Sequence, residues 1–153
     1  MTTPNHHGSC YCGAVQVSVQ GEPVFSAYCH CESCRKWHAA PIATLAAWPR
    51  GAVEVKGEVT KSTKNDQTVR TACVRCGGSV LSTKPGLDWN VVYPLTLAGS
   101  SFEYQPAFHI FYGERVMDIN DGLPKFADVP QEAGGSGTLV DEPQISKWLS
   151  NPA

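Results

Sequence analysis

The chain has 153 residues, of which 42% are hydrophobic and 17% charged, and its formal net charge is −2. This length and composition are typical of one globular domain with a buried core. The near-neutral charge and the scattered lysines and arginines exclude the basic surface of a nucleic-acid-binding protein. No apolar run approaches the roughly 20 residues that a transmembrane helix needs. We therefore expect no nucleic-acid partner and no membrane association.

The first seven residues contain no basic segment followed by an apolar one, so they do not resemble a signal peptide. We expect residues 1–7 to form a mobile tail, in which His6 and His7 are solvated. A cytoplasmic location is expected, and disulfides are rare in that compartment. The seven cysteines agree with this, because an odd number cannot pair completely within one chain.

Short segments with strand periodicity follow one another along the chain, separated by turn residues. The predicted strands cover residues 14–20, 24–28, 42–48, 52–59, 79–82, 90–95 and 107–112. A short helical turn is predicted over 35–41, a flexible stretch over 133–137 and a helix near 145–149. Because no segment shows a long helical period, the sequence predicts a mainly-β fold.

All seven cysteines lie in three short motifs, which are Cys10-x-Cys12, Cys29-x-Cys31-x-x-Cys34 and Cys73-x-x-Cys76. Zinc with four protein thiolates is closed, whereas zinc with three keeps a position open for water or substrate. The two pairs together supply four sulfurs, and we predict that they form a structural zinc site. Such a site joins distant parts of the chain, and zinc binding in small finger domains contributes on the order of 10 kcal/mol to folding.

Two interpretations of the central triplet, Cys29, Cys31 and Cys34, remain open. A histidine completes the tetrahedron in the first, with His30, His38 and His109 as the candidates. The fourth position is open for chemistry in the second.

Two further interpretations of the cysteines make them buried core thiols or a redox pair. Isolated core thiols do not fall into such tight groups. A redox centre at Cys31-x-x-Cys34 or Cys73-x-x-Cys76 is disfavoured, because neither pair lies in a clear strand-to-helix context.

An open zinc with three soft sulfur ligands favours a soft fourth partner, such as a substrate thiol. A thiol bound there would lose its proton and become a nucleophile at neutral pH. Its natural reaction is addition to a small electrophilic carbon such as an aldehyde, and the reverse reaction cleaves a carbon–sulfur bond. The triplet therefore predicts a thiol–aldehyde adduct as the substrate class.

The motifs together resemble the glutathione-dependent formaldehyde-activating enzyme family, also called the CENP-V/GFA domain. The resemblance is carried by Cys10-Tyr-Cys12-Gly-Ala-Val, Cys29-His-Cys31-Glu-Ser-Cys34-Arg, Cys73-Val-Arg-Cys76-Gly, Phe108-His-Ile110 and Asp121-Gly-Leu-Pro-Lys-Phe126. It implies an Mss4-like fold of short antiparallel strands organised around two zinc sites. We expect the zinc domain to span residues 8–130, followed by a C-terminal extension over 131–153.

The resemblance also implies roles for individual residues. Cys10, Cys12, Cys73 and Cys76 would bind the structural zinc, and Cys29, Cys31 and Cys34 the catalytic one, which is expected to be the more easily lost. The family's founding activity combines formaldehyde and glutathione into S-hydroxymethylglutathione, and it is classed as a carbon–sulfur lyase.

Two cations beside the metal loop, Arg35 and Lys36, are candidates for binding the carboxylates of glutathione, although both are equally consistent with solvated surface charges. Trp37 and Trp48 are expected to pack in the core. The alternative function is a non-enzymatic binding module in which both zinc sites are structural.

Overall fold

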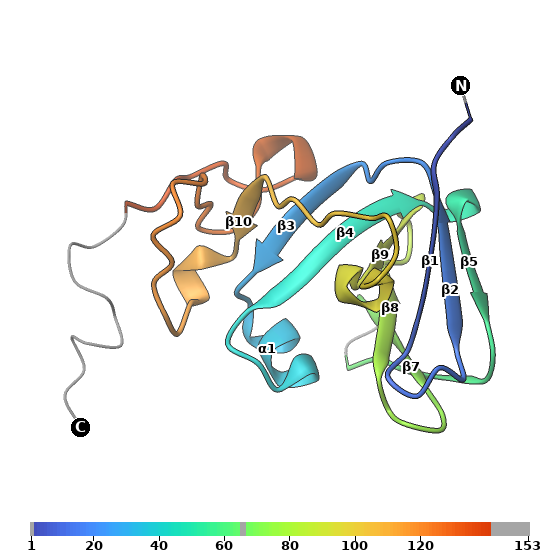
Figure 1. The fold of residues 1–153 in the computed structure, drawn as a ribbon. Coiled ribbons are helices and arrows are strands. Elements are labelled where there is room, and N and C mark those ends of the chain that lie inside the picture. The colour runs from blue at the N-terminus through green and yellow to red at the C-terminus, as the bar shows by residue number, and fades with distance from the viewer. Residues whose placement is uncertain (1, 65–66, 142–153) are drawn as a thin grey trace. The chain divides into compact units, whose positions relative to one another are not determined.

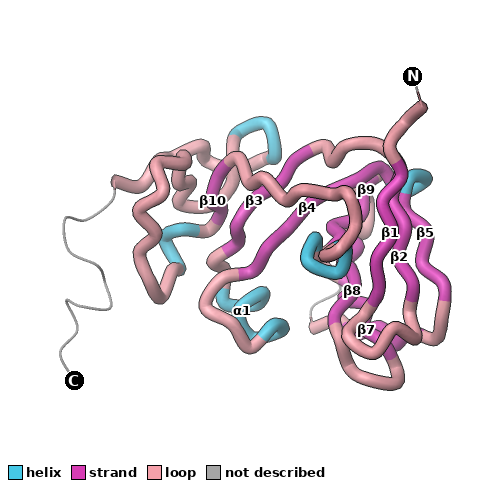
Figure 2. Tube along the Cα trace, in the orientation of Figure 1, coloured by secondary structure: helices cyan, strands magenta, loops and turns pink. Residues whose placement is uncertain are grey.

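A computed structural model describes residues 2–64 and 67–141 of the chain. The chain divides into two compact units, Met1–Ser26 with Leu45–Gln105 and Ala27–Thr44 with Pro106–Ala153. Strands and loops dominate, and helical turns are few and short (Figure 2). The mainly-β prediction is therefore confirmed. None of the described helices is long and apolar enough to cross a bilayer.

The first unit contains a three-stranded antiparallel sheet in the order β1-β2-β5, shown side by side in Figure 1. Its strands are β1 (Asn5–Ser9), β2 (Gln16–Gln20) and β5 (Val53–Lys56). The alternation in β2 places Val17 and Val19 in the core and leaves Gln16 and Gln20 exposed. This is the two-residue period of a half-buried strand, and it confirms the predicted strand at this place.

A second run of antiparallel strands in the same unit has the order β4-β9-β8-β7-β6. These strands are β4 (Ala43–Pro49), β6 (Val59–Ser62), β7 (Val69–Cys73), β8 (Ser79–Thr83) and β9 (Trp89–Val92). The core includes Trp48, which is fully buried and donates its indole N–H to the Gly21 carbonyl at 2.8 Å. The prediction that Trp48 packs in the core is confirmed.

The predicted N-terminal tail is wrong for residues 5–7, which belong to β1. His6 is only 5% exposed, and its Nδ1 lies 3.0 Å from the Ser101 hydroxyl. Its ring also packs edge-on against Phe102, with centroids 5.3 Å apart. The sequence Asn-His-His-Gly-Ser has no apolar alternation, so its strand forms through these tertiary contacts. His7 is exposed, as expected.

The second unit places the end of β3 (Phe25–Cys29) beside β10 (Phe108–Ile110) in a parallel pair, with Cys29 opposite Ile110. The His30 N–H continues this ladder by donating to the Ile110 carbonyl at 3.0 Å. Helix α1 (Glu32–His38) follows immediately. On the other side of β10, the His109 N–H donates to the Pro124 carbonyl and the Phe126 N–H donates to the His109 carbonyl. These ladders bring residues 121–126 close to the end of β3.

Several predicted boundaries shift. The segment 52–59 divides into β5 and β6 at Gly57, where φ is +121° and an added Cβ would lie 2.5 Å from the Ala14 carbonyl oxygen. The segment 90–95 ends in a 3-10 turn, Pro94–Leu97. Further 3-10 turns cover Arg50–Ala52, Tyr112–Glu114 and Gln131–Ala133. The helix predicted near 145–149 lies outside the described residues.

The glycine-rich stretch after residue 130 is hydrogen-bonded to the segment before it. Ala127 donates to the Thr138 carbonyl and Val140 donates to the Lys125 carbonyl. The Asp128 carboxylate accepts hydrogen bonds from Ser136. The predicted flexible stretch at 133–137 is therefore wrong for Ser136, which anchors it. The domain boundary at residue 130 stays a prediction.

Candidate functional site

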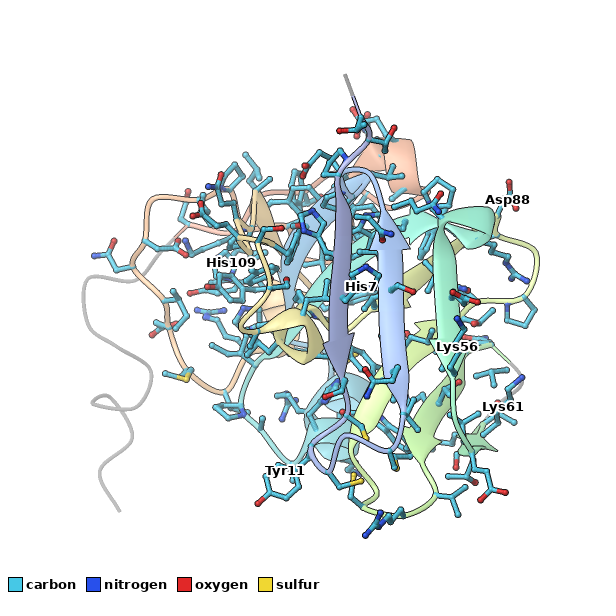
Figure 3. All side chains as sticks on the ribbon, turned by 45° about the vertical axis from the view of Figure 1, so that its right-hand side comes forward. His7, Tyr11, Lys56, Lys61, Asp88 and His109 are labelled. Atoms are coloured by element: carbon cyan, nitrogen blue, oxygen red, sulfur yellow. The ribbon has the colours of Figure 1, made fainter. Side chains whose placement is uncertain are left out.

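The first unit contains one of the two cysteine groups. The Sγ atoms of Cys10, Cys12, Cys73 and Cys76 all lie within 4.8 Å of one another. Two tight turns deliver them, and in each the second cysteine is followed by a glycine with positive φ, +81° at Gly13 and +72° at Gly77. An added Cβ would meet nothing at either glycine, so the left-handed backbone itself is what favours glycine there. Tyr11, between the first pair, is 95% exposed and points away from the ribbon (Figure 3).

Hydrogen bonding and crowding within this group shift the pKa values of two of its thiols, Cys76 and Cys12. The Gly78 N–H donates to the Cys76 sulfur at 3.3 Å, and this hydrogen bond is the main reason that the pKa of Cys76 falls to about 6. The Ala14 N–H acts in the same direction on Cys12, but desolvation and the three neighbouring thiols outweigh it and raise the pKa of Cys12 to about 11. Four thiolates therefore need a positive charge between them, which a zinc ion would supply.

The second unit contains the other group, in which the sulfurs of Cys29, Cys31 and Cys34 lie within 4.8 Å of one another. Cys29 ends β3, Cys31 is the N-cap of α1 and Cys34 lies in the first turn of that helix. The Cys34 N–H donates to the Cys31 sulfur at 3.3 Å, as in an ordinary side-chain N-cap. A strand-to-helix context is thus present at Cys31-x-x-Cys34, and the expectation that none exists is wrong.

Burial and crowding make the triplet a fit for a soft metal ion. The neighbouring thiols Cys31 and Cys34, followed by desolvation, raise the pKa of Cys29 well above its ordinary value. Three anionic sulfurs at this spacing require a cation. Among the described residues, no histidine or carboxylate supplies a further atom to the group. The three candidates His30, His38 and His109 therefore do not complete a tetrahedron in this structure.

The cations beside the triplet are already engaged with the protein. Arg35 donates from Nε to the His30 carbonyl at 2.9 Å and from Nη2 to the Glu114 carbonyl at 3.1 Å. Lys36 lies 2.7 Å from Glu32 on the exposed side of α1. Both residues line an open depression of about 440 Å³ along α1. Their role in binding a substrate stays a prediction.

A polar network that starts at His30 and is buried at His30, His109 and Lys125 was not found by sequence reasoning. His30 Nε2 lies 2.8 Å from His109 Nδ1, and His109 Nε2 lies 2.8 Å from the Asp121 carboxylate. Lys125 completes the network, since its Nζ lies 2.8 Å from the other Asp121 oxygen. His109 and Asp121 both fall in motifs that the sequence singled out, but their pairing depends on tertiary structure. Figure 3 labels His109.

Burial, followed by the positive charge of its neighbours, lowers the pKa of His30 to about 4, so this imidazole is neutral at physiological pH. Desolvation alone would raise the pKa of Asp121. Hydrogen bonds from Lys125, His109 and the Leu123 N–H outweigh it and bring that pKa to about 2. The network therefore combines a neutral His30 with an ionised carboxylate.

The family model for the glutathione-dependent formaldehyde-activating enzyme matches residues 5–114, which is most of the chain and includes all seven cysteines. The chain belongs to this family. The match begins inside β1, in agreement with the ordered strand there. It ends before Asp121 and Lys125, so the part that these two residues take in the network is known from the structure and not from the family match.

Two other proteins are similar to this family member. An uncharacterized lyase of Schizosaccharomyces pombe is 31% identical over 75 residues, which is 48% of this chain and 54% of the yeast protein. The chain thus matches about half the length of that relative. A crystal structure of a Rhodobacter sphaeroides protein aligns over 61% of this chain and 88% of its own, with a TM-score of 0.51 and 22% identity. This second likeness shows a shared fold.

Proposed function

We propose that the chain is a zinc-dependent carbon–sulfur lyase that acts on a thiol–aldehyde adduct of the S-hydroxymethylglutathione type. The observation that carries the proposal is the isolated triplet of Cys29, Cys31 and Cys34, to which no other described histidine, cysteine or carboxylate contributes an atom. Family membership and the name of the yeast relative support the same reaction class.

The proposed reaction breaks one carbon–sulfur bond and transfers one proton. In the cleavage direction, the hydroxyl of R–S–CH2–OH loses its proton, the carbon–oxygen bond becomes a carbonyl, and the carbon–sulfur bond breaks. The sulfur keeps the electron pair and takes up a proton, giving a thiol and formaldehyde. A zinc ion bound by the three thiolates would act as a Lewis acid that stabilises this sulfur as an anion.

The chain's own residues shape the surroundings of the reacting sulfur. The Cys34 N–H and the N-terminal turn of α1 fix the Cys31 sulfur, and the Arg35 guanidinium fixes the loop carbonyl of His30. We infer that the depression lined by Arg35 and Lys36 receives the peptide part of the thiol, with the two cations facing its carboxylates.

Replacing Cys31 with serine tests this function with little risk to the fold. Serine is a favoured N-cap residue and retains an oxygen for the Cys34 N–H, so α1 should persist. The loss of one of three thiolates should nevertheless abolish turnover. Exchange between 13C-formaldehyde and its glutathione adduct can be followed by NMR at equilibrium. Wild-type exchange rates in the Cys31→Ser protein would contradict the proposal, and Ser33→Ala, in the same exposed turn, is the control.

The alternative, a binding module with two structural sites, requires a fourth protein ligand at the triplet. A zinc-loaded protein whose triplet metal accepts no added thiol and whose exchange rate equals the uncatalysed one would favour that alternative.

A further inference from the structure

Four residues of the second unit form one continuous hydrogen-bonded network, Lys125–Asp121–His109–His30. The three contacts along it, from ammonium to carboxylate to the two imidazoles, are each 2.8 Å long. The Lys125 side chain is 2% exposed, and both histidines are fully buried. The rings of His109 and His30 also contact Tyr112, with centroids 5.5 and 4.8 Å away. The network is thus buried at Lys125 and at both histidines, whereas the Asp121 side chain is 29% exposed.

The direction of each hydrogen bond follows from the Asp121 end. An ionised carboxylate only accepts hydrogen bonds, so His109 Nε2 must carry a proton. Asp121 already accepts from the Lys125 ammonium and from the Leu123 N–H. A second buried cation at His109 would share this one carboxylate with Lys125, and therefore a neutral His109 is favoured. Its Nδ1 is then an acceptor, and His30 Nε2 donates to it.

This order leaves a lone pair on the far nitrogen of His30. His30 Nδ1 is buried, and no partner contacts it within the described part of the chain. Leaving a buried acceptor unpaired is unfavourable, so such a group normally has a hydrogen-bond partner, which a bound molecule can supply. His30 is the residue between Cys29 and Cys31 in the sequence, which places it next to the proposed substrate site.

We propose that Asp121 and Lys125 act through His109 as positioning residues that fix His30 as the Nε2–H tautomer. In this state His30 Nδ1 is a hydrogen-bond acceptor for a donor group of the bound substrate, namely the hydroxyl of a thiol–aldehyde adduct. This last use of the acceptor rests on the function proposed above, whereas the tautomer itself does not.

Replacing Asp121 with asparagine should reverse the direction of the two hydrogen bonds that His109 makes, while the same residues remain paired. Lys125 can only donate, so the single amide oxygen of the substituted side chain would turn to it and the NH2 group would face His109. His109 Nε2 would then accept, its Nδ1 would carry the proton, and His30 would become the Nδ1–H tautomer. One substitution at Asp121 would thus move a proton on His30, which is two residues further along the network.

Side-chain 15N–1H correlation NMR of the zinc-loaded protein distinguishes the two tautomers directly. We expect His30 and His109 to be Nε2–H tautomers in the wild type and Nδ1–H tautomers in Asp121→Asn. Asp128→Asn is the matched control, because that carboxylate binds Ser136 outside the network, and it should change neither histidine. Unchanged tautomers in Asp121→Asn would overturn the proposal. If that variant fails to fold, a wild-type His30 carrying its proton on Nδ1 would overturn it equally.

Activity gives a separate readout. If the proposed function holds, Asp121→Asn should lower kcat by a factor of about 10–100 at unchanged zinc content, as for other groups that orient a site from behind its ligands. A tautomer switch without any wild-type lyase activity would refute the proposed function and leave the positioning network supported. Full activity together with a tautomer switch would refute the use of Nδ1 by the substrate.

Discussion

The sulfurs of Cys12 and Cys73 lie 3.9 Å apart although 61 positions separate them in the chain. A metal at this group would close that long loop, so its removal should affect the stability of the whole first unit. We predict that Cys73→Ser loses the metal of the four-thiol group and unfolds at a lower temperature than Cys31→Ser. Metal analysis combined with thermal unfolding compares the two variants. A soluble Cys73→Ser protein that retains two zinc ions and the wild-type Tm would refute the assigned grouping.

Gly8 provides a test of the β1 strand. A Cβ at this position would lie 1.9 Å from the Thr96 carbonyl oxygen and 2.7 Å from the Leu97 Cα, both of them backbone atoms. Overpacking against backbone typically costs 1–3 kcal/mol, so Gly8→Ala should lower the free energy of unfolding by about 2–3 kcal/mol. Gly51→Ala meets nothing and is the matched control. Equal unfolding midpoints in urea for the two variants would mean that residues 5–9 do not pack against the backbone of Thr96 and Leu97.

Ala39 offers a stabilising substitution at the end of α1. It caps the helix in the left-handed region, with φ 49° and ψ 43°, a conformation that favours glycine. Relief of the left-handed strain exceeds the entropy that glycine adds to the unfolded chain, so Ala39→Gly should raise the free energy of unfolding by about 0.5–1 kcal/mol. Ala40→Gly, without positive φ, should lower it. Urea unfolding measures both, and a destabilised Ala39→Gly would contradict the cap.

The contribution of Asp121 to the free energy of unfolding should decrease at low pH. Its pKa in the folded protein is about 2, below the ordinary value of 3.8, so the carboxylate stabilises the fold above pH 4 and this contribution is lost as the pH falls toward 2. The difference in unfolding free energy between wild type and Asp121→Asn should therefore be constant from pH 7 to 5 and shrink only below pH 4. Urea unfolding across this range tests it. A difference that shrinks near pH 6 would place the titration on another group.

Local patterns predicted the parts of the structure that local physics determines. The apolar alternation around Val17 and Val19 identified β2, and the cysteine spacings separated the thiols into the two groups that the structure brings together. Tight turns need only a few neighbouring residues, so Gly13 and Gly77 were informative in the sequence alone.

The features that the sequence did not reveal depend on contacts between distant residues. β1 forms because His6 reaches Ser101 and Phe102, which no local pattern in Asn5–Ser9 encodes. Helix α1 begins at Glu32, before the predicted turn over 35–41. The sequence did not show this start because the N-cap residue is Cys31 and cysteine is not a usual N-cap residue. The contact between His30 and His109 spans 79 positions and requires the parallel β3–β10 pair.

The most direct test of an open triplet site is the sulfur coordination of the zinc-loaded protein before and after a thiol such as glutathione is added. We predict two zinc ions per chain, one with four protein sulfurs and one with three, and an increase in the average number of sulfur ligands when the thiol binds. X-ray absorption at the zinc edge measures this average. Two zinc ions that already have complete protein ligand sets, with no change on adding thiol, would contradict the open triplet site.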